Sequence, residues 1–229
     1  MLLEIIIFML KNIFTHNWWA ILYFNFKMLP LKQAIFLPFD FYGKIKFESL
    51  SGTVKLYTSN LKFGIIKIGS QGRDMFANSE TVLSLNGKVH IEGRLVIGVG
   101  TSIICKKNAH LHFGLNTILG ARNIVYCEEC IKCKENFLTS WDCQIMDSDT
   151  HPVYDLITGE TKSYTKPIIF GNHVWLGNGV IINKGTTIPD NTIVASRSLC
   201  NKDYTQEGNF CIIAGTPAKV VSRNKTWEI

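Results

Sequence analysis

The sequence predicts an all-β solenoid, because its apolar residues recur with a period of six. From Phe170 onward every sixth residue is apolar: Phe170, Leu176, Ile182, Ile188, Val194 and Cys200. The fourth residue after each of the first five is small or β-branched: Val174, Val180, Thr186, Thr192 and Ser198. A helix would repeat near 3.6 residues and a lone strand every two. A sustained period of six therefore indicates short strands that wrap around a solenoid.

The turns between these strands have their own residue type. Two of them carry Gly179 and Gly185, and a third carries Asn191, always three residues after the apolar position. Gly and Asn tolerate a positive φ, which a tight turn requires. The repeat therefore alternates a short strand with a tight corner.

The same period occurs earlier in the chain with interruptions. It is carried by Leu85, Ile91, Ile97 and Ile103, then by Phe113, Leu119 and Val125, and then by Cys133, Thr139 and Ile145. The next position in that register is His151, after which the repeat stops until Phe170. Residues 152–167 fill the gap and are rich in Thr, Ser, Tyr and Gly. We expect them to form a loop that projects from the solenoid, since long loops in compact domains usually serve a function.

Residues 1–47 lack the repeat and form a separate arm. Five Lys stand there against Glu4 and Asp40, so the arm supplies half of the net charge of +6. Its aromatic clusters predict one or two amphipathic helices that end near Pro30 or Pro38. The arm could cap the first coil, which every solenoid requires, and we prefer that interpretation. It could also lie on a membrane surface.

Cysteine content and hydropathy indicate the cellular compartment. The chain has seven Cys, an odd number, and no cleavable signal sequence is expected. Both observations favour reduced thiols in the cytoplasm. Peripheral contact with the inner face of the membrane stays open. No run reaches the 18 apolar residues of a spanning helix. The small charge excess and the absence of a basic run or a known motif argue against nucleic-acid binding.

The stretch FGNHVWLGNGVIINKGTTIPDNTIVASRSLC, residues 170–200, resembles the hexapeptide-repeat acyltransferases. MDSDTH at 146–151 and AGTPAKVV at 214–221 bring it close to the maltose, galactoside and polysaccharide O-acetyltransferases. The resemblance covers residues 85–221 and implies a left-handed parallel β-helix, a homotrimer with active sites between neighbouring subunits, and acetyl-CoA as donor. We expect domain limits of 1–47 for the arm, 48–221 for the β-helix with its loop, and 222–229 for a tail.

His151 is the predicted general base. An imidazole with an ordinary pKa near ~6.5 can accept the proton of an attacking sugar hydroxyl at neutral pH. Asp147 and Asp149 flank it, and alternation along a strand would place all three on one face. Either carboxylate could then orient the imidazole. Trp175 follows His151 by 24 residues, a spacing that matches the sugar O-acetyltransferases, where the Trp lines the acyl site.

The resemblance also implies a set of coenzyme A contacts. They are Gly177, Asn178, Ser196, Asn201, Lys202 and Lys219. A coil of 18 residues would additionally stack Lys184 on Lys202 as a cationic column for phosphates. No clear match exists for the Asn that contacts the acceptor in the sugar branch, although Arg122 and Asn123 lie near that region. The acceptor is therefore predicted only as a sugar or glycan hydroxyl.

Three alternatives are weighed against acetyl transfer. Cys127, Cys130 and Cys133 form C-x₂-C-x₂-C, but residues 134–139 lack the fourth Cys that an iron–sulfur run needs. Cys143 lies ten residues on, a poor spacing for a zinc ligand, and inward-packed thiols explain the pattern better. A γ-carbonic anhydrase-like zinc hydratase would need His in the repeats, and the corresponding turns contain none. A non-catalytic scaffold module is the remaining alternative. We predict no metal, and direct transfer without an acyl-cysteine.

Overall fold

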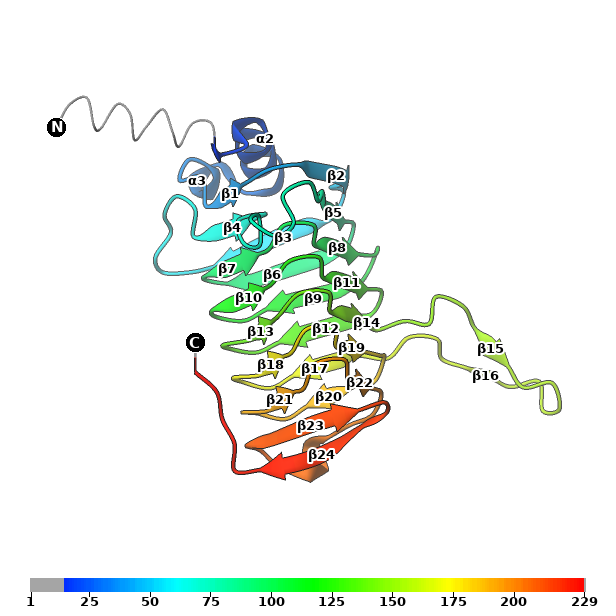
Figure 1. Cartoon of the computed structure of the whole chain (residues 1–229). Coiled ribbons are helices and arrows are strands. Elements are labelled where there is room, and N and C mark those ends of the chain that lie inside the picture. Colours follow the sequence, from blue (N-terminus) through cyan, green and yellow to red (C-terminus); the bar gives the residue numbers. More distant parts are fainter. Residues whose placement is uncertain (1–14, 229) are drawn as a thin grey trace.

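The structure is a computed structural model, and it describes residues 15–228. The chain winds through three parallel sheets in turn, so that each coil contributes one strand to each sheet (Figure 1). The first sheet contains β1 (Phe39–Phe41), β4 (Ile66–Ile68), β7 (Leu95–Ile97), β10 (Thr117–Leu119), β13 (Leu138–Thr139), β18 (Trp175–Leu176), β21 (Ile193–Val194), β23 (Cys211–Gly215) and β24 (Ala218–Arg223). The second contains β2 (Ile45–Ser49), β5 (Thr81–Leu85), β8 (Ser102–Cys105), β11 (Ile124–Cys127), β14 (Gln144–Met146), β19 (Ile181–Ile182) and β22 (Leu199–Cys200). The third contains β3 (Thr53–Tyr57), β6 (Lys88–Glu92), β9 (His110–Phe113), β12 (Cys130–Cys133), β17 (Ile168–Phe170) and β20 (Thr187–Ile188).

The sixfold apolar positions form the core, which confirms the predicted all-β solenoid. From Phe170 to Cys200 every one of these six side chains is fully buried. The small-residue positions between them are buried as well, because they lie at the corners where the chain turns inward. Trp175 pairs with Ile193 at the 18-residue spacing of an ideal coil, whereas Leu95 pairs with Thr117 across 22 residues. The earlier coils are longer at their corners, which is why the period slips there.

Two helices cover the N-terminal end of the solenoid. Helix α2 (Trp18–Met28) is capped by Asn17, whose side chain accepts a hydrogen bond from Ala20 N at 3.1 Å. Asn25 is buried and exchanges hydrogen bonds with the backbone of Phe39 at 2.8 and 3.1 Å, which fixes α2 to β1. Helix α3 (Leu31–Ala34) follows after Pro30. Both helices therefore pack on the first coil.

The predicted limit between arm and β-helix at residue 47 needs correction. Strand β1 pairs with β4 and β2 pairs with β5, so the first coil begins at Phe39. These strands escaped the repeat count because the next strands of their sheets follow after long connections, without a sixfold register. Residues 1–14 of the predicted arm lie outside the described residues. None of the helices described has the length and apolar character needed to cross a bilayer.

The predicted loop projects from the corner between the second and third sheets. It carries a short hairpin of β15 (Val153–Tyr154) and β16 (Thr161–Lys162), which extends far from the solenoid (Figure 1). Its two ends are joined by a bridge between Ser148 and Thr165 and by a hydrogen bond from Lys166 N to Asp147 O at 2.9 Å. From here on, the arm means residues 147–167 and no longer the N-terminal residues 1–47. The corner that carries it, together with residues 183–186 and 201–204, is called the arm corner.

The C-terminal end is closed by an antiparallel pair. After β22 comes a short 3₁₀ helix, η1 (Thr205–Glu207), and then β23 and β24 turn back on each other. The tail beyond β24 runs back along the solenoid in Figure 1. There Trp227 stacks on His173, with ring centroids 4.3 Å apart and planes 9° apart. The tail is therefore fixed against the start of β18.

Candidate active site

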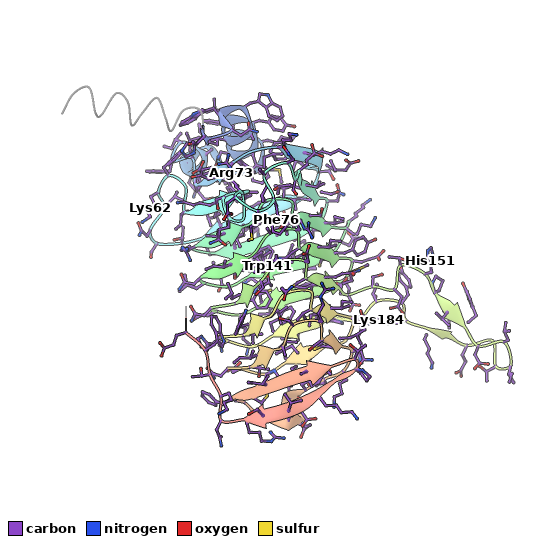
Figure 2. All side chains as sticks on the ribbon, in the orientation of Figure 1. Lys62, Arg73, Phe76, Trp141, His151 and Lys184 are labelled. Atoms are coloured by element: carbon purple, nitrogen blue, oxygen red, sulfur yellow. The ribbon has the colours of Figure 1, made fainter. Side chains whose placement is uncertain are left out.

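His151 stands at the root of the arm, exposed to solvent (Figure 2). Strand β14 ends at Met146, and the chain then leaves the solenoid. Thr150 has φ 63°, so the backbone turns immediately before His151. The predicted alternation along an extended strand is therefore wrong, and the two flanking carboxylates do not share a face with the imidazole.

Asp147 stabilises the neighbouring coil instead of orienting His151. Its carboxylate is buried and accepts hydrogen bonds from the backbone N–H groups of Glu128, Glu129 and Cys130 at 2.7, 2.9 and 2.7 Å. Burial raises the pKa of Asp147, and these three donors oppose that rise. Its three donors all belong to the chain around the start of β12, and its contacts are therefore with the neighbouring coil.

Asp149 forms an ion pair with Lys184. Its Oδ2 lies 2.5 Å from Nζ of Lys184, which also donates to Ser163 O at 2.7 Å. Lys184 belongs to the turn after β19, so one side chain ties both ends of the arm to the next coil. Figure 2 places His151 and Lys184 together at the root of the arm. Asp149 therefore holds the segment that carries His151.

The stacking of Lys184 and Lys202 follows from the register, but their charges are partly compensated. Ile182 pairs with Cys200, so both lysines lie two residues beyond a matched pair in the arm corner. Lys184 pairs with Asp149, and Lys202 lies 3.2 Å from Glu207. A phosphate at this corner would meet two lysines that already have acidic neighbours.

Trp175 lies on β18 in the first sheet, away from the arm corner. Its ring is half-buried, and Nε1 donates to Ser140 Oγ at 3.2 Å. The ring centroid of Trp227 lies 6.1 Å away. Within one chain, therefore, the structure does not bring His151 and Trp175 together.

The predicted coenzyme contacts fall in three places. Gly177, Asn178 and Ser196 share the corner between the first and second sheets, which we call the Trp141 corner and define by residues 120–123, 140–143, 177–180 and 195–198. Asn201 and Lys202 are exposed at the arm corner, and Lys219 is exposed on β24. Gly177 is needed for close packing, because a Cβ there would lie 2.7 Å from the backbone N of Ser196.

At the Trp141 corner, Arg122 of the expected acceptor region lies with Asp142, Trp141 and Phe76, which the sequence did not single out for a site. Arg122 lies 2.6 Å from Asp142 through Nη2, and its guanidinium stacks over Phe76 at 4.4 Å. Trp141 is exposed beside this pair. Arg122, Asp142 and Arg197 all have φ between 56° and 61°. This shared turn conformation at non-glycine residues is the signal that could have marked the corner.

Asn123 has a structural role. It is buried, and its amide donates to Gly120 O, Thr139 Oγ1 and Ser140 O while its oxygen accepts from Cys143 N at 2.7 Å. Its hydrogen-bonding capacity is used up. Of the two residues near the expected acceptor region, only Arg122 is therefore open to a ligand.

The cysteines point into the solenoid. Only Cys130 reaches the surface, and burial raises the pKa of its thiol, so the protonated form is favoured at neutral pH. Within residues 15–228 no three His, Cys, Asp or Glu side chains gather in a way that could hold a metal ion. Of the C-x₂-C-x₂-C pattern, Cys127 and Cys133 lie in the core of the solenoid.

Comparison with known proteins finds sequence similarity to several acetyltransferases. No protein-family model matches it. The chain is 26% identical to a polysialic acid O-acetyltransferase of Escherichia coli O1:K1 / APEC over 60% of its own length and 41% of the relative. It is 27% identical to the galactoside O-acetyltransferase of Escherichia coli K12 over 49% of the chain and 54% of the relative. A polysialic acid O-acetyltransferase of Neisseria meningitidis is 28% identical over 60% of the chain and 68% of the relative.

The chain thus spans about half the length of the first two of these relatives. The similarity agrees with the sixfold repeat and with the solenoid of parallel sheets. Taken together, these observations show a solenoid of hexapeptide repeats whose sequence is similar to sugar and polysialic acid O-acetyltransferases.

Proposed function

We propose that the chain transfers an acetyl group from acetyl-CoA to a hydroxyl of a sugar or glycan. The observation that carries the proposal is the exposed imidazole of His151, held at the root of the arm by the Asp149–Lys184 ion pair. Its support comes from relatives that are named O-acetyltransferases of polysialic acid and of galactosides. Nothing comparable supports the zinc hydratase or the scaffold module.

His151 acts as the general base. One imidazole nitrogen takes the proton of the acceptor hydroxyl as that oxygen attacks the thioester carbonyl. The carbon–sulfur bond then breaks, and the leaving thiolate of coenzyme A takes the proton from the imidazolium. Asp149 is a positioning residue, because it acts on the backbone of the arm root through Lys184 rather than on the imidazole.

The complete site forms between two copies of the chain. His151 projects from the arm corner, whereas Trp175 faces outward from the first sheet, so only neighbouring copies can bring the two together. This supports a homotrimer, a symmetric assembly in which every interface is the same. Asn178 and Ser196 of the Trp141 corner and Asn201 and Lys202 of the arm corner then hold the coenzyme, with Lys219 near its phosphates.

The proposed acceptor is a carbohydrate, in line with the relatives. Arg122 and Trp141 are the exposed groups of the Trp141 corner that suit a sugar: a ring face for stacking and a guanidinium for a polar or acidic substituent. A cytoplasmic location accompanies the proposal, since seven free cysteines suit a reducing compartment.

The test is release of free thiol from acetyl-CoA by the purified chain, with galactosides, maltose and polysialic acid as acceptors. Acceptor-dependent release establishes the reaction and names the acceptor. Absence of release together with absence of coenzyme A binding by calorimetry would favour the scaffold. Stoichiometric bound zinc would favour the hydratase.

A further inference from the structure

The outer face of the N-terminal cap is apolar and uncovered by residues 15–228. Helix α2 buries Ala20, Ile21 and Phe24 against the solenoid, yet its other side is also apolar. Large exposed side chains on α2, on α3 and after them are Trp18, Trp19, Leu22, Tyr23, Phe26, Leu31, Ile35 and Phe36. A helix that is apolar on all sides is ordinarily covered on all sides. The cap therefore presents an interaction surface.

Several of these side chains are large and mostly exposed to solvent. Trp19 is 65% exposed and Leu31 is 69% exposed, and the rings of Trp19 and Tyr23 stack with centroids 5.1 Å apart. Both helices lie together at the same end of the solenoid (Figure 1). We call the eight residues the cap face.

The charge within the cap helices is of one sign, and the neighbouring Glu48 on β2 is paired with Lys46. Residues 15–39 contain no Asp or Glu but do contain Lys27 and Lys32. Both lysines are exposed, and neither forms an ion pair within the part of the chain that the structure describes. A surface with apolar groups and negative charge is complementary to these side chains.

We propose that the cap face docks on the surface of an anionic lipid bilayer. Trp and Tyr rings favour the headgroup level of a membrane, and Phe, Leu and Ile side chains reach the acyl boundary. Lys27 and Lys32 are attracted to anionic headgroups. Docking the end-on cap of a second copy is disfavoured, because it would bring like charges together.

In this proposal, opposite faces of α2 serve capping and membrane contact. The inner face of α2 closes the first coil, and the outer face meets lipid. Strand β14, which leads into His151, lies four strand spacings from β2 in the second sheet, or roughly 19 Å at about 4.8 Å per spacing. Docking through the cap face thus leaves the arm clear of the bilayer. This proposal is independent of the reaction.

The test is co-sedimentation of the full chain with vesicles of phosphatidylcholine alone or mixed with phosphatidylglycerol. The wild type is expected to sediment with the mixed vesicles. The double variant Trp19→Gln/Phe26→Gln is expected to lose at least tenfold in its partition onto them. The matched control is Leu156→Gln/Ile157→Gln at the tip of the arm, which removes two side chains that are 98% and 95% exposed and should leave the partition unchanged.

Two further measurements make the result decisive. Lys27→Gln/Lys32→Gln is expected to weaken binding to mixed vesicles several-fold, and an unchanged thermal midpoint confirms that each variant is folded. A wild type that stays in the supernatant with both vesicle types overturns the proposal. So does an equal loss in the cap and arm variants, or a cap variant whose only change is a smaller particle mass in solution.

Discussion

Asp149 and Lys184 form an ion pair that fastens the arm to the solenoid, with 2.5 Å between Oδ2 and Nζ. The pair joins residues 35 positions apart and stands two residues from His151. Lys184 also donates to Ser163 O near the other end of the arm, so it clamps both ends. The position of the proposed base therefore depends on a lysine that is remote in sequence.

Replacing Lys184 with Met should lower kcat by about ten- to hundredfold, because a displaced catalytic group loses its productive geometry. The free energy of unfolding should change little, since a half-exposed ion pair contributes under about 1 kcal/mol. Lys184→Arg should restore most of kcat. Lys46→Met, which breaks the Lys46–Glu48 pair at 2.6 Å in the first coil, is the control. A Lys184→Met variant with normal kcat would contradict the role of Lys184 in positioning His151.

Replacing Asn123 with Ala should destabilise the fold. The change removes the partners of Cys143 N and Ser140 O, whereas Gly120 O still accepts from Thr101 Oγ1, and each buried unpaired group costs about 1–3 kcal/mol. We expect a loss of about 3 kcal/mol in urea unfolding. Asn201→Ala at the exposed arm corner should stay within about 0.5 kcal/mol. Comparable values for the two variants would contradict the structural role of Asn123.

Asp147 should make stability depend on pH in the acid range. Burial raises its pKa in the folded chain above the ordinary value of 3.8, so the folded state binds the proton more tightly than the unfolded state. This contribution is fully present below pH 3.8 and is lost as pH rises through the raised pKa. The stability of the wild type relative to Asp147→Asn should therefore fall across that window. A difference that grows with pH would mean that the three N–H donors outweigh burial.

Mixed assemblies should test whether each site is built by two copies. His151→Ala and Trp175→Ala chains are each expected to be nearly inactive alone. When the two are co-expressed and purified through two different tags, half of the copies supply an intact His151 and half an intact Trp175. Selection through both tags retains only mixed trimers, and in each of these one interface in three, or about a third, holds both residues. Recovery of about that share of wild-type activity is expected, whereas no recovery would place both residues in a site within one copy.

The coils could be predicted from the sequence because their determinants are local. Leu176 and Val194 are both fully buried, as the sixfold count requires. An apolar residue at each sixfold position is enough to predict this burial. Strands β1 and β2 could not be found this way, because their partners β4 and β5 lie across long connections with no constant spacing.

The site was less predictable, because it depends on contacts between distant residues. His151 was located by its register, but Thr150 turns the backbone, so the direction of the carboxylates could not be inferred from alternation. The partner of Asp149 is a lysine in another coil, and Trp227 reaches His173 across 54 residues. Such pairs are set by the stacking of coils and by the path of the tail, neither of which has a short-range signal.

The central claim is that His151 is the base, and the most direct measurement is acceptor-dependent thiol release by three proteins. They are the wild type, His151→Ala, and the control His110→Ala, which removes an exposed imidazole from the third sheet. We expect the His151 variant to lose about 10²–10⁴-fold in kcat and the His110 variant to keep the wild-type rate. Equal rates in the wild type and the His151 variant, with the same acceptor, would contradict the account.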